Sequence, residues 1–183
     1  WSSDGALPIS ATDEQIRDMK RLLDRQLSMG SIGLSCGLEY APGAYASNRE
    51  LVELLKVVAV HDGLFAIHMR NEDDRVEEAI SETVDMAKQA GVRLQISHLK
   101  AQNPANWHKG PAMLGIIEQA QRDGLDVAFD RYPYIAFSTG LSSFLPLSER
   151  QGSADDVIAR LTDPAKATEL EKYANSRIER LGG

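Results

Sequence analysis

The chain has 183 residues, of which 43% are hydrophobic, and 27 acidic against 20 basic residues give it a net charge of −7. This is enough for one globular domain with a buried core. The acidic balance gives no counterion-release drive toward nucleic acid, and no run of Lys and Arg could bind an anionic lipid surface. No apolar stretch approaches the ~18–20 residues that span a bilayer, so nucleic acid and membrane are excluded as expected partners.

The cysteine content and the first residue bear on the cellular compartment of the protein and on whether the chain has its natural N-terminus. Cys36 is the only cysteine, so no internal disulfide can form, which fits the reducing cytoplasm that we expect as its location. The chain starts with Trp1 rather than Met, so we expect a processed, trimmed or fragment start. No signal peptide is visible, although a missing natural N-terminus would hide one.

In chain order, the sequence predicts helices and strands that alternate. Four helices are predicted. The first follows a capping box at Thr12 and Gln15, and the second runs from an N-cap at Asn48 toward His61. The third covers Glu72–Ala90 and stops at Gly91, and the fourth runs from Pro111 to Gly124. Short apolar runs predict buried parallel strands at Ile32–Cys36, Leu64–His68, Leu94–His98 and Leu125–Asp130.

A strand and a helix recur about every 30 residues, which predicts right-handed βαβ crossovers and a parallel sheet. An open doubly wound sheet satisfies this pattern as well as a barrel does, but no Gly-x-Gly-x-x-Gly phosphate loop follows any predicted strand. We therefore predict an α/β fold, a partial (β/α)8 TIM barrel of about four parallel βα units, since a complete barrel takes about 250 residues.

The pattern changes after Leu145-Pro146. Two helices are predicted over residues 154–161 and 164–181, and no further strand follows. Four strands cannot close an eight-stranded barrel. We divide the chain into residues 1–146, the central part of a barrel, and residues 147–183, a helical tail or insertion.

His68 and His98 are the sharpest candidates for chemistry, because each is the last residue of a predicted strand. The carboxyl ends of parallel strands meet at one mouth, where matching points on neighbouring strands lie about 5 Å apart. Two imidazoles there can bind one divalent ion, although two unrelated polar residues near strand ends would give the same pattern. Arg70 and Lys100 follow the histidines at the same offset and are either solvated rim charges or groups that bind a substrate carboxylate.

The other candidates are expected to be structural. Cys36 is interpreted as a small buried residue at a strand end. His61 at a helix end and His108 in a loop are expected to be non-catalytic.

Six segments occur in a consistent order between about residues 10 and 146: residues 33–35 with 37–43, 67–72, 95–100, 106–107, 130–134 and 138–141. They resemble the GLSSGLxYxPG, SHIRDE, QISHLK, NW, DQYPY and STGL segments of N-acyl-D-amino-acid deacylases, also called D-aminoacylases. Several independent motifs at consistent spacing make this resemblance specific.

The resemblance implies an amidohydrolase barrel that hydrolyses the amide bond of N-acyl-D-amino acids and releases a D-amino acid and a carboxylate. It implies metal-assisted hydrolysis with one or two zinc ions, in which an Asp moves the proton to the leaving amine. At the matching positions of this sequence, the resemblance implies that His68 and His98 are zinc ligands. It also implies that Lys100, Tyr132 and Ser138 bind the substrate carboxylate and that Tyr40 lines the pocket for the acyl group or side chain.

The departures from the family pattern are equally specific. The His-x-His of the first strand, the bridging cysteine and the late-strand catalytic Asp have no match, and Cys36 stands where the family has the second Ser of GLSSGL. Asp130 belongs to a different motif. We therefore assign no catalytic residue within the chain and expect it to be inactive alone.

Two alternatives remain open at this point. One is an inactive α/β piece that only folds and self-associates. The other is a different metal-dependent barrel hydrolase, similar to lactonases or phosphotriesterases, which would keep the histidine pair without needing Lys100, Tyr132 and Ser138.

A four-strand section of a barrel also leaves two unpaired edges and an inner face that we predict to be apolar. The predicted inward residues are Ile32, Leu34, Phe65, Ile67, Ile96 and Phe129, or the residues that alternate with them, and all are expected to be apolar. We expect a homodimer through the exposed sheet edges, unless the two tail helices cover the open face.

Overall fold

The computed structural model describes residues 11–150 and 152–180, so the features discussed at Trp1 and Leu181 lie outside the described residues. Its α-helices and strands are α1 (Asp13–Ser28), β1 (Gly33–Gly37), α2 (Asn48–Val60), β2 (Leu64–His68), α3 (Val76–Ala90), β3 (Arg93–Ile96), α4 (Gly110–Arg122), β4 (Val127–Phe129), α5 (Ala154–Leu161) and α6 (Pro164–Arg180). Short 3₁₀ turns are η1 (Gly43–Tyr45), η2 (Pro104–Lys109), η3 (Leu141–Phe144) and η4 (Leu147–Arg150). The predicted alternation of helix and strand is confirmed.

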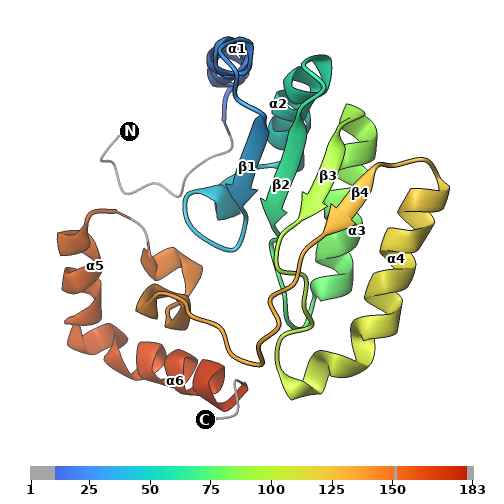
Figure 1. The fold of residues 1–183 in the computed structure, drawn as a ribbon. Helices are drawn as coiled ribbons and strands as arrows, with labels where there is room; N and C mark the ends of the chain where they lie inside the picture. Colours follow the sequence, from blue (N-terminus) through green and yellow to red (C-terminus); the bar gives the residue numbers. More distant parts are fainter. Residues whose placement is uncertain (1–10, 151, 181–183) are drawn as a thin grey trace.

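The four strands form one parallel sheet in the order β1-β2-β3-β4. Figure 1 shows α2, α3 and α4 along one side of this sheet, while α5 and α6 lie beyond the carboxyl ends of the strands. Sequential parallel order with a helix after each strand is the arrangement of a barrel section rather than of a doubly wound sheet, in which the order reverses.

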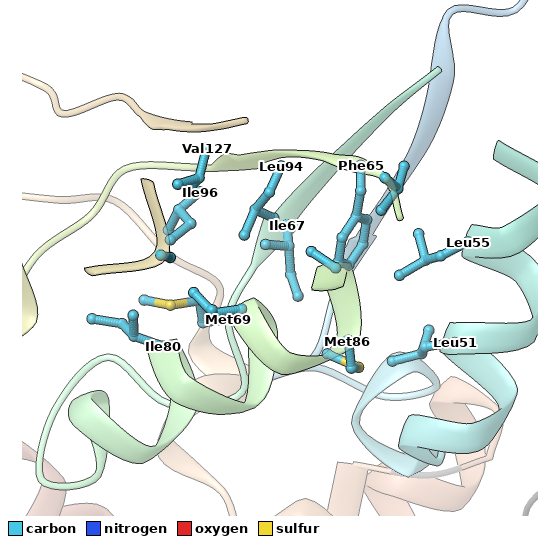
Figure 2. Packing of buried hydrophobic residues seen from close by; sticks show 14 of the residues in the cluster. Leu51, Leu55, Phe65, Ile67, Met69, Ile80, Met86, Leu94, Ile96 and Val127 are labelled. Carbon is cyan, nitrogen blue, oxygen red and sulfur yellow. The ribbon is translucent and has the colours of Figure 1, made fainter. Parts of the chain in front are cut away.

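The core lies between the sheet and its helices. Partner residues in a parallel register point to the same side, and Phe65 pairs with Leu94, which pairs with Val127. Figure 2 shows this row, together with Ile67 and Ile96, facing α2 and α3. The helices contribute buried side chains at Leu51, Leu55, Ile80 and Met86. Burial of each such side chain contributes about 1.5–3 kcal/mol, so this layer is the main stabilising contact of the fold.

The prediction of an apolar open face is wrong. Phe65, Ile67 and Ile96 are fully buried on the helix-covered side, and Leu34 shares that side because it pairs with Phe65. Side chains alternate along a strand, so the opposite face carries the small or polar residues Ser35, Ala66, Gln95 and Ala128. Of the other predicted inward residues, Ile32 precedes β1 and is 84% exposed, and Phe129 at the end of β4 is 42% exposed.

Several element boundaries differ from the predictions for local reasons. The capping box at Thr12 is confirmed, but α2 is capped by Ser47, whose hydroxyl accepts from the Glu50 N–H at 3.2 Å, and Asn48 is its first residue. Helix α3 begins at Val76 rather than Glu72, because the Asn71 side chain accepts from backbone N–H groups at residues 73 and 75 and turns the chain there. The early part of the predicted helix is therefore a loop at the carboxyl end of β2.

The strand boundaries differ from the predictions by one or two residues at each changed end. β2 has the predicted bounds, whereas β1 is shifted by one residue, β3 ends before His98, and β4 is shorter than its apolar run. No helix in the described part of the chain is long and apolar enough to cross a membrane.

The tail helices begin as predicted. Ser153 and Asp156 form a capping box for α5, and Pro164 opens α6. Helix α6 brings Leu170, which is 7% exposed, and Arg177 against the rest of the molecule.

Candidate metal and substrate site

The two predicted metal ligands lie side by side. His68 ends β2 and continues the strand alternation onto the face opposite Phe65 and Ile67. Its ring centroid is 4.6 Å from that of His98, with the planes nearly perpendicular at 77°. Nδ1 of His68 is 2.9 Å from Nε2 of His98, a hydrogen-bond distance, so the two rings face one another through these nitrogens.

The position of His98 depends on Asp130 in the next unit. His98 follows the end of β3 and has a left-handed backbone with φ 41°, a conformation that only a few per cent of residues other than glycine adopt. The Asp130 carboxylate accepts from the His98 backbone N–H at 2.7 Å and from the Gln95 side chain at 2.9 Å. The Asp130 backbone carbonyl also accepts from the Leu99 N–H at 2.8 Å, so this residue fixes the turn that aims the imidazole at His68.

Carboxylates flank the pair on both sides. Oε2 of Glu39 lies 2.9 Å from Nε2 of His68, and Oε1 of Glu72 lies 2.8 Å from Nδ1 of His98. Burial pushes the pKa of Glu39 upward, but the hydrogen bond from His68 and the positive charges of His68, Arg177 and Arg150 outweigh it and leave the pKa lowered. An ionised carboxylate at the outer nitrogen of His68 favours a proton there and leaves Nδ1 free as an acceptor.

Lys100 fills the space between Glu72 and His98. Its Nζ donates to Oε2 of Glu72, to the carbonyl of His98 at 3.0 Å and toward Nδ1 of His98 at 3.2 Å. These contacts use all three donors of the ammonium group, whose side chain is 12% exposed. The ammonium also lies 5.5 Å from the centroid of the Tyr132 ring. Partial burial and the charge of Glu72 raise the pKa of Tyr132.

A cavity of about 390 Å³ opens over these groups. Six of the seven site residues chosen from the sequence line it: Tyr40, His68, His98, Lys100, Tyr132 and Ser138. They come from the last residue of β2 and from the segments after β1, β3 and β4, which meet at the carboxyl ends of the strands as predicted.

Arg70 is not among the lining residues. Its guanidinium donates to the backbone carbonyls of Ala44 and Ala46 and pairs with Glu82 on α3. It therefore braces the loop after β1 against α3 instead of facing the cavity.

The other polar residues weighed at the sequence level also lie outside the cavity. Cys36 is a free thiol whose pKa burial raises to about 11, and it shares the helix-covered side of the sheet with Ile67. His61 pairs with Asp24 at 2.7 Å. His108 is exposed in η2.

Sequence reasoning missed three charged residues that line the cavity, Glu39, Glu72 and Arg177, and also Asp73, which pairs with Arg177. The two glutamates had a visible signal, since each stands a few residues beyond a strand end within a motif. Arg177 had none. It reaches Asp73 at 2.9 Å and Glu39 at 3.7 Å from a helix more than 100 residues later in the chain.

The donor set fits a divalent cation. His68, Glu72 and His98 each offer one ligand atom, and these atoms all lie within 4.8 Å of one another. Oε1 of Glu72 is buried without a hydrogen-bond partner, because its contact with His98 falls outside hydrogen-bonding geometry. Two imidazoles and a carboxylate are donors that zinc accepts.

Comparison with known proteins gives a consistent result. No family model matches the chain. The chain is 40% identical over 141 residues to an N-acyl-D-glutamate deacylase, and 36% identical over 132 residues to a D-aminoacylase, both of Alcaligenes xylosoxydans xylosoxydans. These matches cover 77% and 72% of this chain but 28% and 27% of the relatives, so the chain spans under a third of their length.

Solved structures agree. The N-acyl-D-glutamate deacylase of Bordetella bronchiseptica, in complex with zinc and a phosphonate inhibitor, superimposes with a TM-score of 0.68 at 36% identity, over 73% of this chain and 28% of that one. A D-aminoacylase crystal structure gives 0.67 at 35% identity, over 71% and 27%.

These structures have the TIM-barrel fold, so the four βα units of this chain are a section of such a barrel. Sequence and fold thus agree over about three quarters of the chain, which belongs to the N-acyl-D-amino-acid deacylase family of the metal-dependent amidohydrolases.

Proposed function

We propose that this chain carries part of the active site of a zinc-dependent hydrolase that cleaves the amide bond of N-acyl-D-amino acids. The observation that carries the proposal is the pair of facing imidazoles beside a lysine, in one cavity at the carboxyl ends of parallel strands. The similar proteins named above are deacylases, which supports the same reaction class here.

In this proposal His68 and His98 hold the metal. Zinc, when bound, supplies Lewis-acid activation of the amide carbonyl and of water. The chain's own residues orient these ligands: Asp130 fixes the His98 turn, and Glu39 holds the outer nitrogen of His68. Such outer contacts set the tautomer and the direction of a metal-binding imidazole.

Lys100, Tyr132 and Ser138 would bind the substrate carboxylate, with Tyr40 beside the acyl group or side chain. All four line the cavity. Since the donors of Lys100 are all in use, an incoming carboxylate would replace one of its present hydrogen bonds, for example the one to Nδ1 of His98. Charge-assisted hydrogen bonds of this kind contribute roughly 1.5–3 kcal/mol, which is enough to select substrates that carry a carboxylate.

The 183 residues hold neither a His-x-His motif nor the late-strand Asp of the family pattern. We therefore propose that residues 1–146 supply ligands and substrate contacts, that residues 147–183 form a separate helical segment over them, and that the chain alone does not turn over substrate. The presence of Lys100, Tyr132 and Ser138 in the cavity argues against the lactonase-like alternative.

Association through the sheet edges also stays a proposal. Within the described residues, β1 and β4 each have a strand partner on one side only. An edge of this kind can pair with a second copy of the chain.

The test is an assay of an enzyme that contains this chain together with the remaining barrel. Zinc-loaded protein should release free D-amino acid from N-acyl-D-amino acids, and it should do so far more slowly from the L enantiomers. Lys100→Ala should raise KM for substrates with a free carboxylate by about 10–100-fold, and should affect the corresponding amides little. Equal losses on both substrate types would show that Lys100 does not bind the carboxylate.

A further inference from the structure

The loop that follows β1 carries two groups of the candidate site. Glu39 lies 2.9 Å from Nε2 of His68, and the Tyr40 ring lies 4.9 Å from the His68 ring, tilted by 50°. Both residues line the cavity. The loop folds back on the strand that it leaves, since a Cβ at Gly43 would overlap a backbone oxygen at the end of β1. The position of its return limb, residues 44–46, therefore affects where these two side chains lie.

Arg70 holds the return limb from the next βα unit. Its Nη1 donates to the Ala44 carbonyl at 2.8 Å, and its Nη2 donates to the Ala46 carbonyl at 3.2 Å. Its Nε lies 3.2 Å from both carboxylate oxygens of Glu82 on α3. A guanidinium presents its donors in one rigid plane, so a single side chain serves both carbonyls and the carboxylate. The side chain of Arg70 is 28% exposed, so these contacts are partly shielded from water.

Tyr40 depends on this limb more directly than Glu39 does. The Tyr40 carbonyl accepts from the Ala44 N–H at 2.8 Å, and the Ala44 carbonyl accepts from Arg70. Two hydrogen bonds thus connect the guanidinium to the backbone of Tyr40. Glu39 is also held from the tail, where Arg177 lies 3.7 Å from its carboxylate. Release of the limb should therefore displace Tyr40 and leave Glu39 in place.

We propose that Arg70 is a positioning residue for substrate specificity. It fixes Tyr40 against His68 and thereby shapes the part of the cavity that takes the acyl group or the side chain of the substrate. The inference rests on the proposed function, which places Tyr40 beside that part of the substrate and gives Arg70 no role. Arg70 is not among the residues that line the cavity, so it acts on the substrate only through the loop.

The competing explanation is that Arg70 only stabilises the fold by joining the loop to α3. Both explanations predict that Arg70→Met is less stable, because two carbonyls and the Glu82 carboxylate lose their donor. They differ in how the loss depends on the substrate. A purely structural contact changes the amount of folded enzyme, which lowers the rate equally for all substrates and leaves KM unchanged. A positioning residue changes KM according to the size of the group beside Tyr40.

The experiment uses the enzyme that contains this chain together with the remaining barrel. In Arg70→Met, KM should rise about 10-fold for substrates with a large acyl group or side chain and less than about 2-fold for N-formyl-D-alanine, with kcat little changed, because a misplaced contact group weakens only the binding of what it touches. Arg70→Lys keeps the charge beside Glu82 but lacks the planar fork, so it should show the same pattern. Arg75→Met removes an exposed arginine from the same loop and should match the wild type.

A double-mutant cycle with Tyr40→Ala tests whether the effect passes through Tyr40. Arg70→Met should raise KM for the large substrates in the wild-type background and have little further effect in Tyr40→Ala, since residues that act together give non-additive changes. Additive changes in KM would overturn the inference. Far-UV circular dichroism checks folding, and Arg70→Lys replaces Arg70→Met in the cycle if the latter does not fold.

Hydrogen exchange separates this inference from the proposed function. The N–H groups of residues 44–46 donate to carbonyls within the loop, so their exchange reports whether the limb is fixed. They should exchange about 10–100-fold faster in Arg70→Met, because two charge-assisted hydrogen bonds are lost, and at the wild-type rate in Arg75→Met.

The two kinds of failure give different results. If the wild-type enzyme releases no D-amino acid while these amides respond to Arg70→Met, the proposed function and the substrate role of Tyr40 are wrong, whereas the fixing of the loop by Arg70 is confirmed. If D-amino acid is released but Arg70→Met has the KM values or the exchange rates of the wild type, only the role of Arg70 is overturned.

Discussion

Arg177 is the residue whose replacement should separate the tail helix from the barrel section. Its guanidinium, in a side chain only 14% exposed, lies 2.9 Å from the Asp73 carboxylate, which is 4% exposed, and 3.7 Å from that of Glu39. Removing one partner of a buried ion pair typically costs 3–5 kcal/mol, because the remaining charge stays buried without compensation. Arg177→Met keeps an aliphatic stem but removes the cation beside Asp73, while Glu39 keeps its contact with His68.

We take the lower end of that range, about 3 kcal/mol, because Asp73 can protonate. Burial, followed by the neighbouring Asp74, already raises the pKa of Asp73, which limits the penalty. A loss of about 3 kcal/mol corresponds to about a 100-fold larger population in which α6 is detached. The buried contact of Leu170 would remain as the main apolar anchor of this helix.

Native-state hydrogen exchange measures this population directly, because amides of residues 164–180 should exchange about 100-fold faster while those of α3 keep their protection. Arg180→Met is the matched control, since Arg180 lies on the same helix and, within the described part of the chain, donates to the carbonyl of Ser176 in its own helix. Unchanged protection of α6 in Arg177→Met, or equal loss in Arg180→Met, would refute the reasoning. Equal acceleration in α3 would show that the tail is not a separate unit.

Three further results are expected. Burial raises the pKa of Cys36 from 9.0 to about 11. At pH 7 this residue should therefore have about 100-fold less thiolate and should react about 100-fold more slowly with iodoacetamide. A reaction rate equal to that of free cysteine would contradict its burial. Asp130→Ala should lower the free energy of unfolding by about 1–3 kcal/mol and weaken zinc binding, because His98 loses the acceptor that holds its left-handed turn. Denaturant titration measures the loss of stability, and calorimetry measures the zinc affinity. The pKa of Glu53 is lowered from 4.5 to about 2, mainly by the hydrogen bond from Lys20. Glu53 should therefore stabilise the fold above pH 4.5 by at most about 1 kcal/mol, and this contribution should be lost as the pH falls toward 2. In Glu53→Gln the free energy of unfolding should depend less on pH over this range.

Local sequence pattern was sufficient for the helices, the strands and the side chains at strand ends. The capping box at Thr12 and the stop at Gly91 were both visible because caps depend on residues within one turn. The convergence of His68, His98 and Lys100 was also predictable, since parallel strands with crossover helices must bring their carboxyl ends to one edge.

The interpretation of the open face failed because the sequence does not state which alternate residues face the helices. Phe65 and Ile67 are as apolar as a barrel lining would require, and only the packing of α2 and α3 determines that they point toward the helices. Once that side is chosen, the pleat places Ser35, Ala66 and Gln95 on the other face.

The sequence by itself determined the βα repeat, the family and six residues that line the cavity, because each depends on short-range periodicity or on contiguous motifs. The tertiary structure decided the partners of those residues. The left-handed turn of His98 is held by Asp130, and the arginine that reaches Glu39 comes from α6. Arg70 and Lys100 share one offset from their histidines but have different environments: Arg70 faces α3 and the carbonyls of a neighbouring loop, and Lys100 faces Glu72. Contacts between segments that are distant in sequence depend on the packing of whole elements, which no local pattern encodes.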